Sequence, residues 1–109
     1  MKAIVYYMRP EFFVHGILGF NHLQAMEKMP DPTALDKTHV MLRDVEAKDF
    51  EDLFRKMQGE VWSPKGEARP LIRSKGLQHT SMSVGDVAVV EKEVFIVDNR
   101  GWRRLGKTA

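Results

Sequence analysis

The sequence predicts an α/β or α+β domain, built from a small, mainly antiparallel sheet with one prominent helix packed on it and a C-terminal β-meander. Three short apolar runs separated by turn residues lie between residues 87 and 105, which is the pattern of consecutive antiparallel strands. Residues 50–57 repeat apolar side chains at helical spacing. A run of β-branched and aromatic residues near the start adds one more strand.

Length and composition indicate one globular domain over residues 1–109. The chain has no Cys, which excludes disulfides, thiolate metal sites and Cys nucleophiles and is typical of a cytoplasmic protein. The first apolar run ends at Arg9-Pro10-Glu11, too soon for a signal-peptide core. No apolar run approaches the roughly 20 residues of a membrane helix. We therefore expect a cytoplasmic protein without a membrane partner.

The first 37 residues read as an N-terminal strand followed by a helix or loop extension. Residues 3–8 are apolar on both faces, as expected of a central strand that ends before Pro10. Residues 11–20 are apolar but contain two Gly, so they fit either a loop packing its aromatics inward or a short irregular helix. Asn21 is a reasonable N-cap for a helix over residues 21–29, and residues 30–37 read as a loop.

The middle of the chain holds the clearest helix. Residues 38–45 alternate well enough for a strand, and a helix over residues 49–58 follows. Acidic residues lie in its first turn and basic residues in its last, as the helix dipole favours. We expect Gly59 to end this helix and its one apolar face to lie across the sheet. That face consists of Phe50, Leu53, Phe54 and Met57.

A long connection precedes the meander. Residues 62–79 carry two Pro and two Gly and read as an ordered loop, and loops of this length are often functional. The meander then consists of strands over residues 87–91, 94–97 and 102–105, joined by short turns.

Parts of this sequence resemble the YodL-like domain. The resemblance rests on the stretch from His79 to Val87, HTSMSVGDV, and on the closing Gly101-Trp102-Arg103-Arg104-Leu105. The helix over residues 50–58, followed by Trp62, also matches the family pattern. The similarity covers residues 38–105. This sequence departs from the pattern at Trp102, where Phe is usual, and at Arg100, where an uncharged residue is common.

The resemblance implies a small protein of a phage, plasmid or other mobile element, from a family without an established activity. It therefore implies a non-enzymatic binding protein, whose partner would be a host or mobile-element protein and which would modulate a host or defence system. No part of this expectation comes from composition or spacing.

The basic residues suggest an alternative function. Residues 1–61 hold 8 Lys and Arg against 10 Asp and Glu, whereas residues 62–109 hold 9 against 5. A solvated surface explains this charge, but so does a face for an anionic partner such as nucleic acid. The candidate partner-binding residues fall in a loop group and a C-terminal group: Lys65, Arg69, Arg73, Lys75, Arg100, Arg103 and Arg104.

Three patterns resemble catalytic or ligand-binding motifs. The segment from His79 to Asp86 holds the residue types of a hydrolase triad, but triad members usually come from separate elements, so we interpret Asp86 as a turn residue that accepts backbone hydrogen bonds. Gly101 to Thr108 has Walker A spacing, yet no helix can follow it within this sequence. His15 and His22 lack a carboxylate at metal-ligand spacing. The sequence predicts no catalytic residue, cofactor or metal.

Two apolar features remain open to more than one interpretation. Trp102, beside its Arg neighbours, could stack on nucleic-acid bases, but we expect it to pack in the core. A homodimer surface is also compatible with the sequence, and its candidate residues are Phe12, Phe13, Met26 and Met29.

Overall fold

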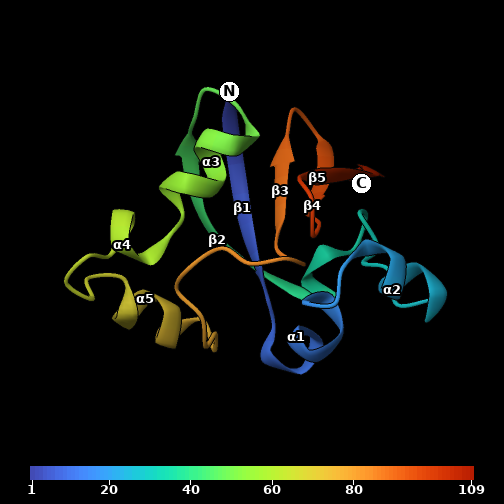
Figure 1. Cartoon of the computed structure of the whole chain (residues 1–109), viewed down its shortest axis with the longest axis horizontal. Helices are drawn as coiled ribbons and strands as arrows, with labels where there is room; N and C mark the ends of the chain where they lie inside the picture. Colours follow the sequence, from blue (N-terminus) through green and yellow to red (C-terminus); the bar gives the residue numbers. More distant parts are fainter.

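The protein forms an α+β fold around one five-stranded antiparallel sheet (Figure 1). The structure is a computed structural model and describes residues 1–109. The strand order is β2-β1-β3-β4-β5, so the first strand is interior and the predicted meander forms the other half of the sheet. In chain order the elements are β1 (Lys2–Met8), α1 (Pro10–Gly16), α2 (Phe20–Ala25), the 3-10 helix η1 (Leu35–Lys37), β2 (His39–Glu46), α3 (Phe50–Lys56), α4 (Gly59–Trp62), α5 (Arg69–Ser74), β3 (Val87–Val90), β4 (Glu93–Val97) and β5 (Trp102–Lys107).

Both faces of the sheet are apolar, and each contributes to its own core. On β1, Ala3, Val5 and Tyr7 belong to one buried cluster, which also contains side chains from α3 and α5. Met8 belongs to the second cluster, whose other members come from α1, α2, η1 and the meander. Because successive side chains of a strand point to opposite faces, β1 links the two cores. Residues 1–37 are thereby part of the same folded unit.

The predicted helix α3 lies against the sheet, and Asp49 is its N-cap residue. The Asp49 carboxylate accepts a hydrogen bond from the Asp52 backbone N–H at 2.8 Å. Leu53 and Met57 are fully buried. Phe50, at the start of the helix, lies 4.9 Å from the Trp102 ring. This contact confirms a packing role for Trp102.

Three expectations about helix boundaries are wrong. Gly59 begins α4 instead of ending α3. The segment 62–79 is not a loop throughout, because it contains α5. Helix α2 starts at Phe20, with Gly19 rather than Asn21 as its N-cap residue. The backbone N–H of Phe20 donates to Asp98 Oδ1 at 3.1 Å. The cap is therefore supplied by the β4–β5 turn, which local sequence does not reveal.

The remaining N-terminal ambiguity resolves in favour of a short helix. Pro10 occupies the first turn of α1, where its missing N–H and fixed φ cost nothing. The longest helices of the structure have seven residues. None of its helices has the length and apolar composition needed to span a membrane.

We predict that Gly85→Ala destabilises the fold by more than about 3 kcal/mol, because it combines left-handed strain with overpacking. Gly85 has φ +98°, and a β-carbon there would lie 2.5 Å from Met8 Sδ and 2.8 Å from the Gly16 carbonyl. Gly101→Ala is the matched control, since Gly101 has φ +76° with no atom within 4 Å of the added carbon. Its cost should be about 1 kcal/mol. Urea unfolding measures both, and equal losses would contradict the steric argument.

Candidate functional site

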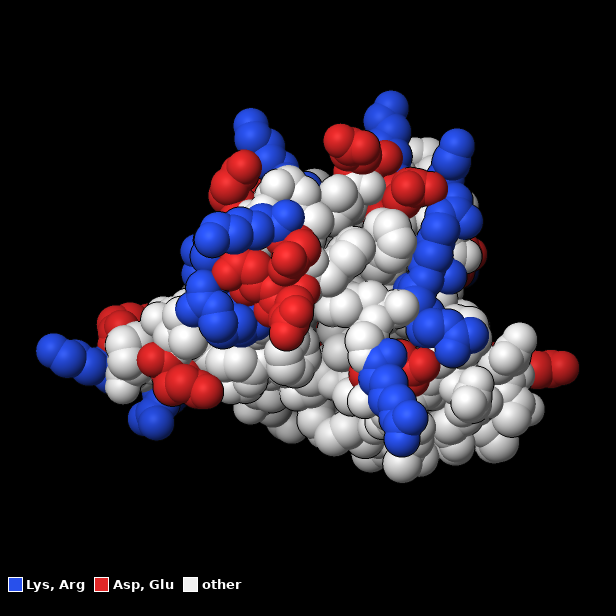
Figure 2. All heavy atoms as spheres, turned by 45° about the horizontal axis from the view of Figure 1, so that its top comes forward, with Lys and Arg blue, Asp and Glu red and all other residues white.

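The two predicted basic groups lie near opposite edges of the sheet. Arg69 and Arg73 are on α5, which Figure 1 places beyond the β2 edge, whereas the C-terminal group is on β5 and the turn before it, at the opposite edge. In Figure 2 a row of Lys and Arg runs along one side, over β5, and uncharged surface separates it from mixed acidic and basic side chains on the other side. The seven predicted residues do not form one patch.

Two Arg of the C-terminal group are engaged within the protein. Arg104 Nε lies 2.9 Å from Glu93 Oε1. Arg103 lies 3.5 Å from Asp98 Oδ2, and its guanidinium carbon is 4.2 Å from the centre of the Phe20 ring. Both side chains are about half exposed, at 48% and 50%, so these pairs add little stability. Their positive charge is nevertheless partly offset by adjacent acids, which weakens the basis for a C-terminal anion-binding surface.

The basic residues of α5 border a hollow of about 320 Å³. Its lining comes from α5 and from the irregular segment that follows: Arg69, Ile72, Arg73, Leu77, Gln78 and Thr80. Lys65 lies before α5 and Lys75 at its C-terminal end. The first predicted group thus contains one concave, positively charged feature.

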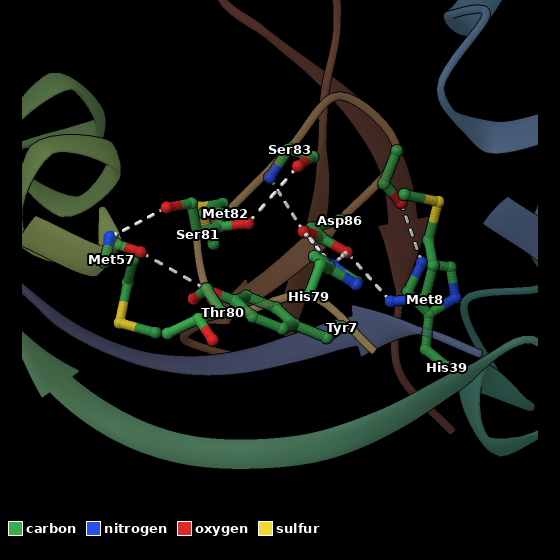
Figure 3. A network of polar contacts seen from close by, with 12 residues as sticks. Tyr7, Met8, His39, Met57, His79, Thr80, Ser81, Met82, Ser83 and Asp86 are labelled. Carbon is green, nitrogen blue, oxygen red and sulfur yellow. Dashed lines mark hydrogen bonds and ion pairs between the residues drawn. The ribbon is translucent and has the colours of Figure 1, made fainter. Parts of the chain in front are cut away.

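Asp86 is the centre of a buried polar network (Figure 3). Its carboxylate accepts hydrogen bonds from the backbone N–H of Met8 and from that of Ser83, each at 2.8 Å. His79 Nε2 is 2.9 Å from Asp86 Oδ2 and 3.1 Å from Oδ1. The carboxylate therefore joins β1, the turn before β3 and the segment after α5. The predicted structural role of Asp86 is confirmed.

The aromatic ring of His79 is sandwiched by the N-terminal part of the chain. Tyr7 stacks on it with ring centres 4.5 Å apart, and Phe13 meets it edge-on at 5.1 Å. The Tyr7 hydroxyl donates to the carbonyls of Thr80, at 2.7 Å, and Met57, at 3.2 Å. Burial, reinforced by the nearby Asp86 carboxylate, raises the pKa of Tyr7. The hydroxyl consequently remains a hydrogen-bond donor.

His79 and Asp86 are in hydrogen-bonding contact, but no nucleophile completes a triad, as expected of residues so close in the chain. Ser81 Oγ accepts from the Gly59 N–H at 2.8 Å, and Ser83 Oγ donates to the Ser81 carbonyl at 3.2 Å. Both hydroxyls thus form hydrogen bonds with backbone groups and not with the His79 imidazole. A nucleophile must lie within hydrogen-bond reach of its base, so the network holds the chain together and is not arranged for acyl transfer.

The other motif-like patterns are structural as well. Residues 102–107 of the Walker-spaced segment form the extended strand β5, so no helix N-terminus faces a phosphate there. The His15 and His22 rings stack with centres 6.1 Å apart. No group of three or more His, Asp or Glu side chains is placed to hold a metal ion.

Four apolar side chains are exposed on α1, at the end of α2 and on the residues between these helices. Helix α1 buries Phe12 and Gly16 and half-buries Phe13, whereas Val14 on the same helix is exposed. In the sequence, residues 14, 17 and 18 have i, i+3, i+4 spacing, although Ile17 and Leu18 follow Gly16, the last residue of α1. Their exposure could not be predicted, because the whole segment is apolar. The exposed fractions are 64% for Val14, 42% for Ile17, 55% for Leu18 and 52% for Met26.

Of the proposed dimer residues, the structure therefore exposes Met26 but not Phe12. Phe12 is 8% exposed and belongs to the second core. Phe13 and Met29 pack against that core and are half-buried.

The most voluminous hollow lies on the sheet itself. It has a volume of about 670 Å³ and an apolar floor that includes Ile4, Tyr6 and Val89. Its rim mixes Lys2 and Lys92 with three acidic side chains. Charges of both signs around one apolar floor do not favour a single class of ligand.

Comparison with known proteins finds no match for this chain among family models, curated proteins or solved structures. The YodL-like resemblance stays a prediction, and function must be argued from the surfaces described above.

We predict that Asp86→Ala lowers the free energy of unfolding by about 3 kcal/mol or more, because each buried donor left without an acceptor costs about 1–3 kcal/mol. Urea unfolding monitored by circular dichroism measures this loss. The control is Asp44→Ala, since Asp44 is exposed and its removal should change stability by less than about 0.5 kcal/mol. A loss below about 1 kcal/mol for Asp86→Ala would contradict its central role.

His39 makes stability depend on pH. Its ring is fully buried. Nε2 donates to the Gly85 carbonyl at 2.8 Å, and Nδ1 accepts from the Thr38 hydroxyl at 2.7 Å, because a carbonyl can only accept. Burial lowers the pKa of His39 below its ordinary 6.5. The other titratable or charged groups that act on this ring are Asp86, His79 and Arg9.

We predict that the protein loses stability as pH falls below 6.5, the ordinary His value, since the unfolded chain then binds a proton that the folded chain excludes. The slope contributed by His39 is at most about 1.4 kcal/mol per pH unit and ends below its folded-state pKa. The measurement compares urea unfolding of wild type and His39→Gln between about pH 7.5 and pH 5. All other titrating groups are common to both proteins, so parallel curves would refute this assignment.

Proposed function

We propose that this protein is a non-enzymatic binding protein that docks on another protein through the exposed apolar surface of α1 and α2. The observation that carries the proposal is the exposure of Val14, Ile17, Leu18 and Met26, each 42–64% exposed, on or directly after two helices that contact each other. Scattered single apolar residues need no explanation, but adjacent ones on one surface indicate an interaction site.

The surface has the features of a protein-binding anchor. Covering a half-exposed aliphatic side chain contributes about 1 kcal/mol, half of what its complete burial contributes, and a few such side chains supply most of the affinity of an interface. The underlying helices are held firmly, because Phe12 and Leu23 are buried in the second core and Asp98 caps α2. The partner therefore meets a surface that is already formed.

The kind of partner follows from the resemblance to the YodL-like domain. That resemblance supports a small protein of a phage, plasmid or other mobile element that binds a host or mobile-element protein and modulates a host or defence system. A partner with an apolar patch and few charges fits the surface. A second copy of this chain is a partner of the same chemistry.

Nucleic-acid binding is the second candidate, and it depends on the basic residues around α5. Because the C-terminal Arg residues lie at the opposite edge of the sheet, only the group from Lys65 to Lys75 is available to one strand. Four cations can neutralise about four phosphates, so the affinity for a single strand should fall with salt with a log–log slope of about −3. A salt titration with DNA and RNA distinguishes this candidate from protein binding.

We predict that Ile17→Ser combined with Leu18→Ser abolishes partner binding while the melting temperature changes little, because both side chains are largely exposed. Partners are first identified by affinity enrichment that compares wild type with this variant. Each protein that is enriched only by wild type is then purified and its affinity measured by calorimetry. Sedimentation equilibrium tests self-association.

The matched control is Met41→Ser combined with Val61→Ser. These side chains are 51% and 43% exposed and lie on β2 and α4, away from the proposed surface. The control should bind like wild type. The proposal fails if both double variants bind equally well, or if no purified protein, including this chain itself, binds through residues 17 and 18.

A further inference from the structure

We propose that the hollow beside α5 binds a tetrahedral oxyanion, namely the phosphate group of a small phosphorylated ligand. Arg69 and Arg73 line it from the helix, and Gln78 and Thr80 line it from the segment that leads toward β3. This site is separate from the α1–α2 surface, so the proposal of a phosphate site can be tested independently of the proposed protein partner.

The two guanidinium groups are free to receive a ligand. Arg69 and Arg73 are one helical turn apart, which places them on the same face of α5. Neither guanidinium group forms an ion pair or a hydrogen bond within the protein, whereas that of Arg55 pairs with Asp52 at 2.8 Å and that of Arg104 with Glu93 at 2.9 Å. Residues 63–80 hold four Lys and Arg against one Glu, a net charge of +3. The hollow therefore has positive charge that no adjacent carboxylate neutralises.

The first wall of the hollow, helix α5, is fixed by buried groups. Ala68 N–H donates to Ser63 Oγ at 2.9 Å where the helix begins. Ile72 is 5% exposed and belongs to the first core. Because the helix is anchored at its start and along its inner face, the Cα atoms that carry the two Arg side chains have defined positions.

The second wall is tied to the core through Thr80. Leu77 is buried, and its N–H donates to the Ile72 carbonyl at 3.0 Å. The Thr80 carbonyl accepts from Tyr7 at 2.7 Å and from Trp62 Nε1 at 3.1 Å, as Figure 3 shows for the Tyr7 side of the network. A site whose walls are held in this way exists before its ligand arrives.

The arrangement of donors favours a tetrahedral anion over a planar one. One guanidinium satisfies a carboxylate through two parallel hydrogen bonds, so a carboxylate would leave most of the site unused. A phosphate oxygen can face each Arg while the remaining oxygens face the Thr80 hydroxyl and the Gln78 amide. The volume of about 320 Å³ is at the lower end of small-molecule sites and accommodates one phosphate with a small organic group.

The experiment is an NMR titration of the ¹⁵N-labelled full chain at constant ionic strength. The probes are inorganic phosphate, sulfate, acetate and a nucleoside monophosphate, with chloride as the balancing anion. We expect saturable shifts confined to residues 69–80 with phosphate, sulfate and the nucleotide, and weaker effects with acetate. Equal binding of acetate, or no saturation with phosphate, would overturn the proposal.

Charge-matched variants separate a site from general ion effects, since phosphate and sulfate stabilise most proteins by exclusion. Arg69→Gln combined with Arg73→Gln should weaken phosphate binding at least about tenfold, given the strength of charge-assisted hydrogen bonds. Arg55→Gln combined with Arg100→Gln removes the same charge elsewhere and should bind like wild type. Equal weakening in both variants would reduce the effect to net charge and refute the site.

An oligonucleotide distinguishes the sources of the phosphate group. If the site binds a single phosphate, the affinity of a short single strand should exceed that of the mononucleotide by at most about tenfold. Its log affinity should fall with log salt concentration with a slope near −1. A steep slope together with tight binding, while phosphate itself produces no shifts, would replace this proposal with a nucleic-acid surface.

Discussion

The buried carboxylate of Asp86 holds together segments that are far apart in the chain. It accepts the backbone N–H of Met8, at the end of the interior strand β1, and that of Ser83, in the turn before β3. It also receives His79, which is stacked on Tyr7. A buried anion without partners would be very costly, so the carboxylate is compatible with the fold only while all three donors stay in place. The β1–β3 pairing and the segment after α5 thus depend on each other.

The turn before β3 is closely surrounded by other elements of the fold. Gly85 donates to the Val97 carbonyl and accepts from His39, and its Cα lies against the Gly16 backbone. Strand β2 supplies His39, and α1 supplies Gly16. Together with β4, which supplies Val97, three elements therefore converge on one residue without a side chain. The first 37 residues are part of this arrangement and not an appendage to the region that resembles the YodL-like domain.

Local patterns in the sequence predict the elements that are stabilised locally. Helix α3 was predictable because its apolar side chains, including the buried Leu53 and Met57, follow helical spacing. The start of α2 was not, because its cap comes from Asp98, more than seventy residues later. Helix α5 was concealed by the Pro and Gly residues around it, since Pro70 lies in the first helical turn, where it is tolerated.

Candidate surfaces were harder to predict than elements, for a physical reason. Residue types reveal charge, but only the fold shows which charges are neutralised and which apolar side chains have nothing to pack against. Arg103 and Arg104 are equivalent to Arg69 and Arg73 in sequence terms, yet acids lie beside the first pair alone. Similarly, the segment around α1 has more apolar side chains than one side of a helix can bury.

The distribution of buried and exposed groups connects the fold with function. The buried polar side chains at its centre have partners: both carboxylate oxygens of Asp86 and both ring nitrogens of His39 form hydrogen bonds. Groups that the fold leaves unused lie at its periphery, as an apolar surface on α1 and α2 and as two free guanidinium groups on α5. Neither set of exposed side chains contributes to the cores, so each can be substituted without loss of the fold. Because these groups make few contacts within the protein, contacts with a ligand there would stabilise the folded state further.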